Sequence, residues 1–224
     1  MRRIAIVLTG YLCLAGPAAL AAPPAPTTDE QKTLYALGLA LSQGLGSFAL
    51  SEAELEQVKV GLTDGVLNRP PKADLKAYGP KIQKLAESRA SVVANAEKKA
   101  GAAYATKAAA ESGAKKTASG AIVIPMKAGN GPTPTADDTV KVHYHGTLID
   151  GTVFDSSVQR GEPARFPLGN VIKCWTEGLQ MIKVGGKSRL VCPSDVAYGD
   201  AGRPPVIKPG ATLTFEVELL EIVK

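Results

Sequence analysis

The side chains that could form a ligand site lie around Trp175, the single tryptophan of the 224-residue chain. This residue stands where a Val-Ile pair meets a short helical pattern. An aromatic side chain in such a place forms either part of the core or the floor of an apolar pocket. Two blocks favour the pocket because they add aromatic and polar groups: residues 140–157 before the tryptophan and residues 197–199 after it.

Each of these side chains also has an ordinary structural explanation. Trp175 and Phe215, taken alone, fit a hydrophobic core better than a binding site. Asp155 precedes two serines, so a turn or a helix cap explains it equally well. The residue types alone therefore leave the choice between core and pocket open.

Other chemistries find little support in the sequence. His143 and His145 lie on one face of an expected strand, as a metal pair would, but they are the only histidines and no third ligand is indicated. Gly185-Gly186-Lys187 is a turn without the spacing of a phosphate-binding loop. No Ser/His/Asp arrangement is suggested. We therefore expect neither a metal nor a cofactor.

The first 21 residues have the pattern of a secretory signal peptide, with Arg2 and Arg3 before an apolar segment and a small-x-small cleavage site at 19–21. They predict export to the periplasm, with the outer surface as an alternative. Loss of two arginines lowers the formal charge from +5 to +3, which gives no case for nucleic-acid binding. The remaining chain has no long apolar run, so no membrane span is expected.

Export would also remove Cys13 and leave Cys174 and Cys192 as an even pair in an oxidising compartment. A disulfide between them would close a loop of about 18 residues and stabilise the fold by about 3 kcal/mol. Two buried free thiols are the alternative. A catalytic redox pair is not expected, because the spacing is not C-x-x-C.

After a proline-rich start at residues 22–27, residues 28–112 predict three helices. Thr28-x-x-Gln31 and Ser51-x-x-Glu54 are capping boxes that open the first two. The first should close at residues 44–46, and the second must stop before Pro70. Their apolar stripes are Leu34, Leu37, Leu41 and Leu45 in the first, and Leu55, Val58, Leu62 and Val66 in the second.

Helix formers dominate residues 72–111, which predict one uninterrupted helix about 60 Å long at ~1.5 Å per residue. Its first half carries an apolar seam and should pack on another element. Beyond Ala94 the composition turns to Ala, Lys, Glu and Thr, which predicts a solvated spacer without a core face. The seam consists of Leu75, Tyr78, Ile82, Leu85 and Val92.

Thin amphipathic helices of this length bury little core by themselves. A second copy of residues 28–112 would complete the core as a two-fold helical dimer. The alternative is that these helices fold back onto the C-terminal half of their own chain. Composition favours the dimer over the fold-back.

The C-terminal half, residues 120–224, changes to short β-branched segments separated by glycine, proline and aspartate. Asp150-Gly151 is a strong hairpin signal. We expect an α+β domain in which a twisted, mostly antiparallel sheet wraps around a short helix within residues 171–180. The expected strands are 121–126, 139–149, 152–154, 165–168, 188–192 and 211–223, and residues 113–119 are expected to form a linker.

A series of blocks in this half resembles the FKBP-type peptidyl-prolyl cis-trans isomerases in sequence, order and spacing. They are V-H-Y-x-G at 142–146, D-G-x-x-F-D-S-S at 150–157, F-P-L-G at 166–169, V-I-x-x-W-x-E-G-L-Q at 171–180, G-G-K at 185–187, A-Y-G at 197–199 and A-T-L-x-F-x-V-x-L-L at 211–220. The preceding helices look like the dimerisation domain of the macrophage infectivity potentiator group, in which a V-shaped dimer carries each catalytic domain on a long helix.

The resemblance implies a role for each matching residue. Trp175 would form the floor beneath the prolyl ring, while the Ile172 N–H and the Tyr198 hydroxyl would bind substrate carbonyl groups. Asp155 would lie at the rim with Arg160 as its ion-pair partner, and Phe154, Asp155 and Tyr198 would be the catalytic residues. The full set of substrate-binding residues would be Tyr144, Phe154, Asp155, Val171, Ile172, Trp175, Tyr198, Ile207 and Phe215.

Three positions depart from the commonest family pattern. Ala164 replaces a wall aromatic and Arg203 replaces a frequent histidine, which affects ligand affinity and sequence preference more than activity. Cys174 replaces a small residue and favours its disulfide with Cys192. The implied activity is prolyl isomerisation of unfolded or partly folded export clients by a homodimer, with macrolide inhibitors of the family as further ligands. A chaperone or surface-interaction protein with a vestigial pocket is the non-enzymatic alternative.

Overall fold

The computed structural model describes residues 25–223. The expected signal peptide, Cys13 and the first part of the proline-rich start lie outside the described residues. The described chain divides into two units, with the boundary between Leu39 and Ala40. The fold class is α+β, as predicted: helices form the N-terminal half and an antiparallel sheet forms the C-terminal half.

The first helix, α1 (Asp29–Ser42), begins at the predicted capping box. The Gln31 N–H donates to Thr28 Oγ1 at 3.2 Å, and the Thr28 N–H donates to Gln31 Oε1 at 3.2 Å. The helix does not close at residues 44–46 as expected, because the chain continues as the 3-10 helix η1 (Gln43–Phe48). Its leucines are more than half exposed in the single chain.

The second helix, α2 (Glu52–Val66), has both bonds of its predicted capping box. Glu54 also accepts hydrogen bonds from Arg89, which donates to the Phe48 carbonyl at 3.0 Å as well. The Arg89 guanidinium and the Ser51 donors hold the pKa of Glu54 at about 2. This charged network joins η1, α2 and the third helix.

The third helix, α3 (Leu75–Ala109), begins three residues after the predicted start because Asp74 caps it, accepting from the Lys76 N–H at 2.9 Å. The prediction of an uninterrupted run overlooked Pro80, which lies within the helix. Proline has no N–H and removes one i to i−4 hydrogen bond. The helix continues past this position to Ala109.

The prediction of a solvated spacer beyond Ala94 is wrong. Ala94, Gly101 and Ala108 are buried at intervals of seven residues, so this half of α3 has a narrow face of small residues. Ala108 packs in a cluster of apolar side chains with Ile122, Ile124 and Val191 of the sheet. Small residues give no hydrophobic stripe in the sequence, yet they allow a helix backbone to approach a sheet closely.

The predicted apolar seam of the first half of α3 lies at the surface of the single chain. Each member of the seam exposes between 43% and 75% of its surface. No helix within residues 25–223 is both long and apolar enough to cross a membrane.

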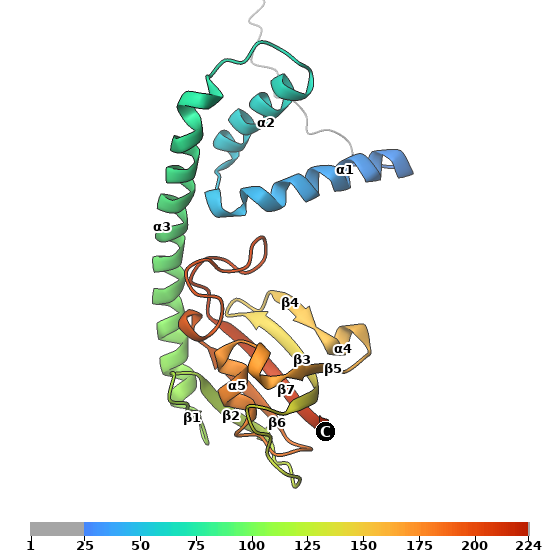
Figure 1. Ribbon diagram of the computed structural model, residues 1–224, viewed down its shortest axis with the longest axis vertical. Coiled ribbons are helices and arrows are strands. Elements are labelled where there is room, and N and C mark those ends of the chain that lie inside the picture. Colours follow the sequence, from blue (N-terminus) through green and yellow to red (C-terminus); the bar gives the residue numbers. More distant parts are fainter. Residues whose placement is uncertain (1–24, 224) are drawn as a thin grey trace, which may run out of the picture. The chain divides into compact units, whose positions relative to one another are not determined.

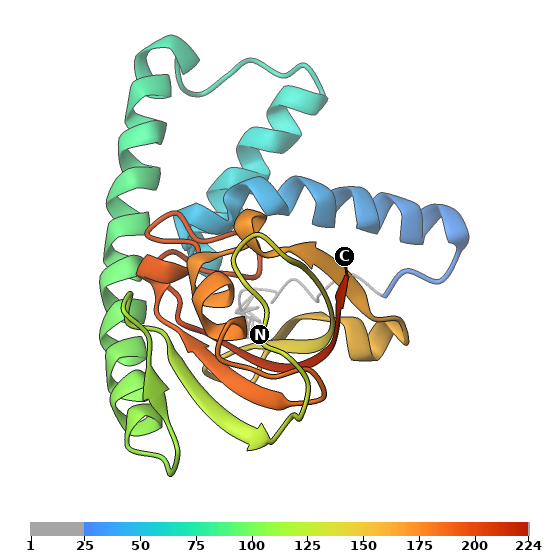
Figure 2. The ribbon, with the colours of Figure 1, turned by 60° about the horizontal axis from the view of Figure 1, so that its bottom comes forward.

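The C-terminal half is a seven-stranded antiparallel sheet in the order β1-β2-β6-β7-β3-β4, with β5 paired to β3. The sheet curls around the short helix α5 (Figures 1 and 2). Its strands are β1 (Lys115–Lys116), β2 (Ile122–Lys127), β3 (Thr139–Leu148), β4 (Val153–Ser156), β5 (Ala164–Pro167), β6 (Lys187–Cys192) and β7 (Leu213–Val223). The short helices are α4 (Ser157–Arg160), η2 (Leu168–Asn170), α5 (Lys173–Leu179) and η3 (Ser194–Val196).

The sheet departs from the sequence prediction in two places. Residues 113–119, predicted as a linker, contain β1, which pairs with β2. The short helix α4 follows β4 and was not predicted. The predicted hairpin turn is present, with Gly151 at φ +88° and the Thr152 N–H donating to Asp150 Oδ1 at 2.9 Å.

The core fills the space between the concave face of the sheet and α5. Strand β3 alternates strictly between buried and half-buried residues, as expected for a strand with one face on a core. β3 and β7 pair from Leu148 opposite Leu213 to Thr139 opposite Val223. The largest fully buried side chains come from η2, α5, β3, β6 and β7, namely Leu168, Leu179, Val140, Val142, Leu190, Val191, Leu213, Val217 and Leu219.

Candidate functional site

The aromatic side chains singled out from the sequence line one cavity of about 320 Å³. Trp175, which is 4% exposed, makes edge-to-face contacts with the rings of Tyr144 and Phe215, at centroid distances of 5.3 and 5.2 Å. The Phe154 ring meets the Phe215 ring at 5.4 Å. We call this cavity the cup, and its lining is Tyr144, Phe154, Asp155, Phe166, Asn170, Val171, Ile172, Trp175, Tyr198, Arg203 and Phe215.

The sheet positions the rings on neighbouring strands. Tyr144 lies on β3 and Phe154 on β4, while Phe215 lies on β7 directly opposite Gly146 of β3. A Cβ atom at Gly146 would come within 2.7 Å of the Phe154 ring and 3.1 Å of the Phe215 ring. Glycine at this position therefore leaves the space that the two rings occupy.

The helix α5 carries the floor of the cup. Trp175 lies in its first turn, and its N–H donates to the carbonyl of Ile172, the N-cap residue, at 2.8 Å. The Ile172 N–H itself makes no hydrogen bond within residues 25–223, so a backbone donor remains free at the cup. The Trp175 Nε1 is also buried without a hydrogen-bond partner in the described part of the chain.

A carboxylate, a phenol and a guanidinium meet at the rim. The Tyr144 hydroxyl donates to Asp155 Oδ2 at 2.5 Å, and Arg160 donates both to Asp155 Oδ1 and, at 2.9 Å, to the Tyr144 oxygen. Arg160 reaches this point because it ends α4, which Ser156 caps by accepting from the Gln159 N–H. The ion pair expected between Asp155 and Arg160 is thus present.

These contacts fix the charge states at the rim. Burial alone would raise the pKa of Asp155, but hydrogen bonds from Tyr144 and Arg160 outweigh it and hold that pKa below its ordinary value. Burial and the Asp155 carboxylate raise the pKa of Tyr144, and the same carboxylate raises the pKa of Arg160. Near neutral pH the rim therefore holds an ionised Asp155, a neutral Tyr144 and a charged Arg160.

Two family models match the chain: "FKBP-type peptidyl-prolyl cis-trans isomerase" over residues 131–220, and "Domain amino terminal to FKBP-type peptidyl-prolyl isomerase" over residues 30–122. FkpA of Escherichia coli K12 is 38% identical over 206 residues, covering 87% of this chain and 76% of the relative. The isomerase Mip of Coxiella burnetii is 33% identical over the full length of both chains. The chain belongs to the FKBP-type peptidyl-prolyl cis-trans isomerase family.

Solved structures of this family have the same fold. The crystal structure of FkpA from Escherichia coli matches with a TM-score of 0.65 at 37% identity, covering 87% of this chain and 97% of the other. A peptidyl-prolyl cis-trans isomerase from Pseudomonas syringae matches with a TM-score of 0.55 at 39% identity, covering 58% of this chain and 96% of the other.

The structure brings together every predicted substrate contact of this FKBP domain except Ile207. Ile207 is buried and lines an adjoining hollow, which shares Phe154, Asp155, Tyr198 and Arg203 with the cup. Residues 204–207 of the loop between η3 and β7 form the rest of the lining of that hollow. Because this hollow adjoins the cup and shares four of its lining residues, the role of Ile207 as a substrate contact stays a prediction.

Sequence reasoning missed Phe166 and Asn170 as members of the cup. Phe166 was assigned only to an edge strand, but its ring meets the Trp175 ring edge-to-face at 5.5 Å. The period-2 pattern of a strand places Ala164 and Phe166 on one face, and this signal could have found it. Of the three departures from the family pattern, Arg203 lines the cup, with its guanidinium 5.9 Å from the Tyr198 ring centroid.

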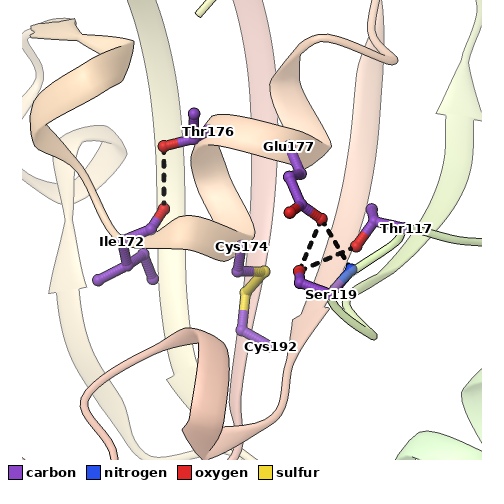
Figure 3. Close-up of a disulfide and its surroundings, with 7 residues drawn as sticks. All are labelled: Thr117, Ser119, Ile172, Cys174, Thr176, Glu177 and Cys192. Atoms are coloured by element: carbon purple, nitrogen blue, oxygen red, sulfur yellow. Dashed lines mark hydrogen bonds between the residues drawn. A yellow bond between two sulfur atoms is a disulfide. The ribbon is translucent and has the colours of Figure 1, made fainter.

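A disulfide fixes the floor of the cup to the sheet. Cys174 of α5 is bonded to Cys192 of β6, with the two Cα atoms 5.6 Å apart, and both residues are fully buried (Figure 3). On the neighbouring turn of α5, Glu177 accepts hydrogen bonds from the Ser119 hydroxyl and N–H at 2.6 and 3.1 Å. The predicted disulfide therefore holds α5 against β6 at the residue next to Trp175, which lines the cup.

The two histidines lie on the opposite face of the sheet from the cup's aromatic rings. His143 Nδ1 is 3.1 Å from Ser157 Oγ, and His145 Nδ1 is 3.0 Å from Ser156 Oγ. Within residues 25–223 no group of three or more His, Cys, Asp or Glu side chains is arranged to hold a metal ion. The serine hydroxyls account for one ring nitrogen of each histidine.

The charge states at the rim predict a flat pH profile. Because the pKa of Asp155 is lowered and those of Tyr144 and Arg160 are raised, kcat/KM should change less than twofold between about pH 5.5 and 8.5. The lowered pKa of Asp155 also stabilises the fold at pH values above about 3.9, the unfolded value. This contribution should be lost as the pH falls through the folded pKa. Peptide isomerisation rates across this range test the profile, and a bell-shaped curve centred near pH 7 would contradict it.

Proposed function

We propose that the cup is the catalytic site and that it binds the prolyl ring of an Xaa-Pro segment against Trp175. In this proposal Tyr144, Phe154, Val171, Ile172 and Phe215 enclose the ring, with Phe166 as a further wall. The free Ile172 N–H and the Tyr198 hydroxyl bind the carbonyl groups that flank the rotating bond. Phe154, Asp155 and Tyr198 act as the catalytic residues.

The proposal suits the physical chemistry of the reaction. Rotation about a prolyl peptide bond breaks no covalent bond, and its barrier of ~20 kcal/mol is the loss of amide resonance. An apolar environment lowers the barrier because it disfavours the charge-separated planar amide relative to the twisted one. Donors at the rim then bind the twisted form more tightly than the planar form. No nucleophile, metal or general base is needed.

The observation that carries the proposal is the ring of aromatic side chains around one cavity, with an unpaired backbone donor beside it. A pocket that binds no substrate would need neither the aromatic lining nor the unpaired donor. A backbone N–H without a partner in the protein can donate to a bound carbonyl group, so its presence favours a site that a substrate carbonyl completes. The ionised Asp155 and Arg160 at the rim add donors and acceptors of fixed position.

We further propose that the protein acts in the periplasm on unfolded or partly folded proline-containing polypeptides. The signal-peptide pattern of residues 1–21 supports export, and an oxidising compartment suits the disulfide of the FKBP domain. Macrolide inhibitors of the family should compete for the cup, with affinity weakened by Ala164, whose methyl group takes the place of a wall aromatic.

The test that separates an isomerase from a chaperone uses one substitution and two assays. Tyr198→Phe should slow catalysis of a proline-limited refolding reaction about tenfold, because one hydrogen bond to the substrate is lost. The same variant should suppress aggregation of a proline-free client as well as the wild type does. If Tyr198→Phe catalysed refolding as well as the wild type does, the result would contradict the cup as the catalytic site. It would then favour the chaperone alternative.

The N-terminal helices support a second proposal, a homodimer. The seam of α3 and the leucines of α1 are exposed in the single chain, which is unusual for so many large apolar side chains. A second copy would cover them and place two cups on one assembly. Two linked cups could engage one client chain at two prolines, which raises avidity without tighter single sites.

Sedimentation of the full chain at micromolar concentration tests the dimer. We expect a dimer for the wild type and a shift toward monomer for Ile82→Glu, which buries a charge in the seam. Lys84→Glu, at an exposed position of the same helix, is the matched control and should leave the dimer intact. A wild-type monomer at this concentration would contradict the proposal.

A further inference from the structure

The loop between η3 and β7, residues 197–212, carries two side chains of the cup, Tyr198 and Arg203. Its middle is held by bonds within the loop: Arg203 and Ile207 exchange two backbone hydrogen bonds, at 2.7 and 3.1 Å. At its start the Gly202 N–H donates to the Tyr198 carbonyl at 3.2 Å. These bonds define the local shape of the loop but do not fix it against the rest of the molecule.

The first contact that fixes the loop joins it to α3 beside Tyr198. The Gly210 N–H donates to the carbonyl of Gly199, the residue after Tyr198, at 3.0 Å. Gly210 itself lies against the α3 backbone, since a Cβ atom there would be 2.7 Å from Ala94 Cα. Ala94 is 2% exposed. Gly210 therefore links the two: it packs against the α3 backbone at Ala94, and it donates a hydrogen bond to Gly199, the residue next to Tyr198.

The second contact lies two helical turns further along α3. A Cβ atom at Gly101 would come within 2.8 Å of Thr212 Cβ and even closer to Thr212 Oγ1. Both residues are buried, so neither has room to move outward. Glycine in a helix interior lowers helix stability relative to alanine. Close packing against Thr212 gives a structural reason for a glycine at this position.

Charges on the same part of α3 face the loop from outside. Lys98 Nζ lies 2.5 Å from Asp200 Oδ1 and 3.6 Å from Asp195 Oδ1, which places it beside both ends of the Tyr198 turn. Glu97 accepts from Lys208 Nζ at 3.2 Å. These pairs are partly exposed and contribute little stability each. They nevertheless pair a lysine of α3 with aspartates at the start of the loop, and a glutamate of α3 with a lysine near its end.

We propose that the segment of α3 from Ala94 to Gly101 is a positioning element of the catalytic site, which holds the 197–212 loop so that Tyr198 and Arg203 face the cup. The proposal rests on the proposed function, because it assigns α3 a role in the same site. It gives the second half of α3 a purpose beyond that of a spacer. It also predicts that a perturbation of this segment alters catalysis without any change to a residue of the cup.

The sharpest perturbation is Gly101→Ala in the full-length protein. In a helix without neighbours this change would increase stability, so a loss of activity cannot come from weakened helix formation. Here the new methyl group must push α3 and Thr212 apart. We expect kcat/KM for a short Xaa-Pro peptide to fall about tenfold, since sub-ångström displacement of a substrate-binding group has effects of this order.

Two further variants separate positioning from general packing. In a Thr212→Gly background the clashing atoms are gone, so Gly101→Ala should have no further effect on kcat/KM, whatever Thr212→Gly does alone. Ala108→Leu crowds the same small-residue face, but against Ile122 and Val191 rather than the loop. It should lower the unfolding temperature and leave kcat/KM within twofold of the wild type.

The outcomes are distinct. The positioning role would be overturned if Gly101→Ala did not lower kcat/KM, or if it lowered kcat/KM equally in the wild-type and Thr212→Gly backgrounds. It would also be overturned if Ala108→Leu lowered kcat/KM as much as Gly101→Ala does. Asp155→Leu is measured in the same assay. If Asp155→Leu is impaired while Gly101→Ala is not, only the positioning role fails. If Asp155→Leu is fully active, the assignment of the cup as the catalytic site fails, and the positioning role fails with it.

Discussion

Replacing Asp155 with leucine should lower kcat/KM for peptide isomerisation about 10- to 100-fold. The carboxylate accepts from both the Tyr144 hydroxyl and the Arg160 guanidinium, so its removal leaves two donors at the rim without their common acceptor. Loss of one placed polar group in an active site commonly costs a factor of this size or more. The rate is measured on an Xaa-Pro peptide below the unfolding temperature of both proteins.

Glu162→Leu is the matched control for this prediction. Glu162 is an exposed carboxylate two residues beyond Arg160 and is not part of the cup. Its removal changes the net charge by the same amount as Asp155→Leu and should leave kcat/KM unchanged. A loss of similar size in both variants would mean that net charge, not the geometry of the rim, causes the effect.

Removing the disulfide should have the largest effect on stability. The double variant Cys174→Ala/Cys192→Ala opens a loop that spans 18 residues in sequence, and the gain in unfolded-state entropy corresponds to about 3 kcal/mol of unfolding free energy. Small cavities left by the buried sulfur atoms add to the loss. Denaturant unfolding of the wild type and the variant measures the difference directly.

A reductant gives an independent check of the same quantity. Addition of dithiothreitol to the wild type should reproduce most of the loss seen in the double variant and should have no effect on the variant itself. Because the bond anchors α5, which carries Trp175, the folded variant should also bind substrate less tightly. Equal unfolding free energies for the oxidised wild type and the variant would contradict this account.

Much of the sheet and the cup could be predicted from the sequence because their patterns are local. The alternation in β3 and the Asp150-Gly151 turn each depend on a few neighbouring residues, so the strand and hairpin predictions agree with the structure. The capping boxes at Ser51 and Thr28 are local as well. The residues of the cup are far apart in the chain, so no local pattern predicts that they lie together. Only the family resemblance predicted that they form one site.

The errors share a different physical cause, since they depend on contacts distant in sequence. The buried face of α3 consists of small residues such as Gly101, whose burial has no hydrophobic signature and becomes evident only against Thr212. The ring of Phe166 belongs to the cup because β5 pairs with β3, a pairing that a short strand does not specify.

The measurement that tests the central claim most directly is the rate of cis-to-trans exchange of an Xaa-Pro peptide at equilibrium, followed by NMR with the full-length protein. Wild type, added at about one-hundredth of the peptide concentration, should accelerate an exchange that otherwise takes tens of seconds. Addition of a non-isomerising proline mimic should abolish the acceleration and perturb the Trp175 indole resonance. A folded wild type that leaves the exchange rate unchanged would contradict the account.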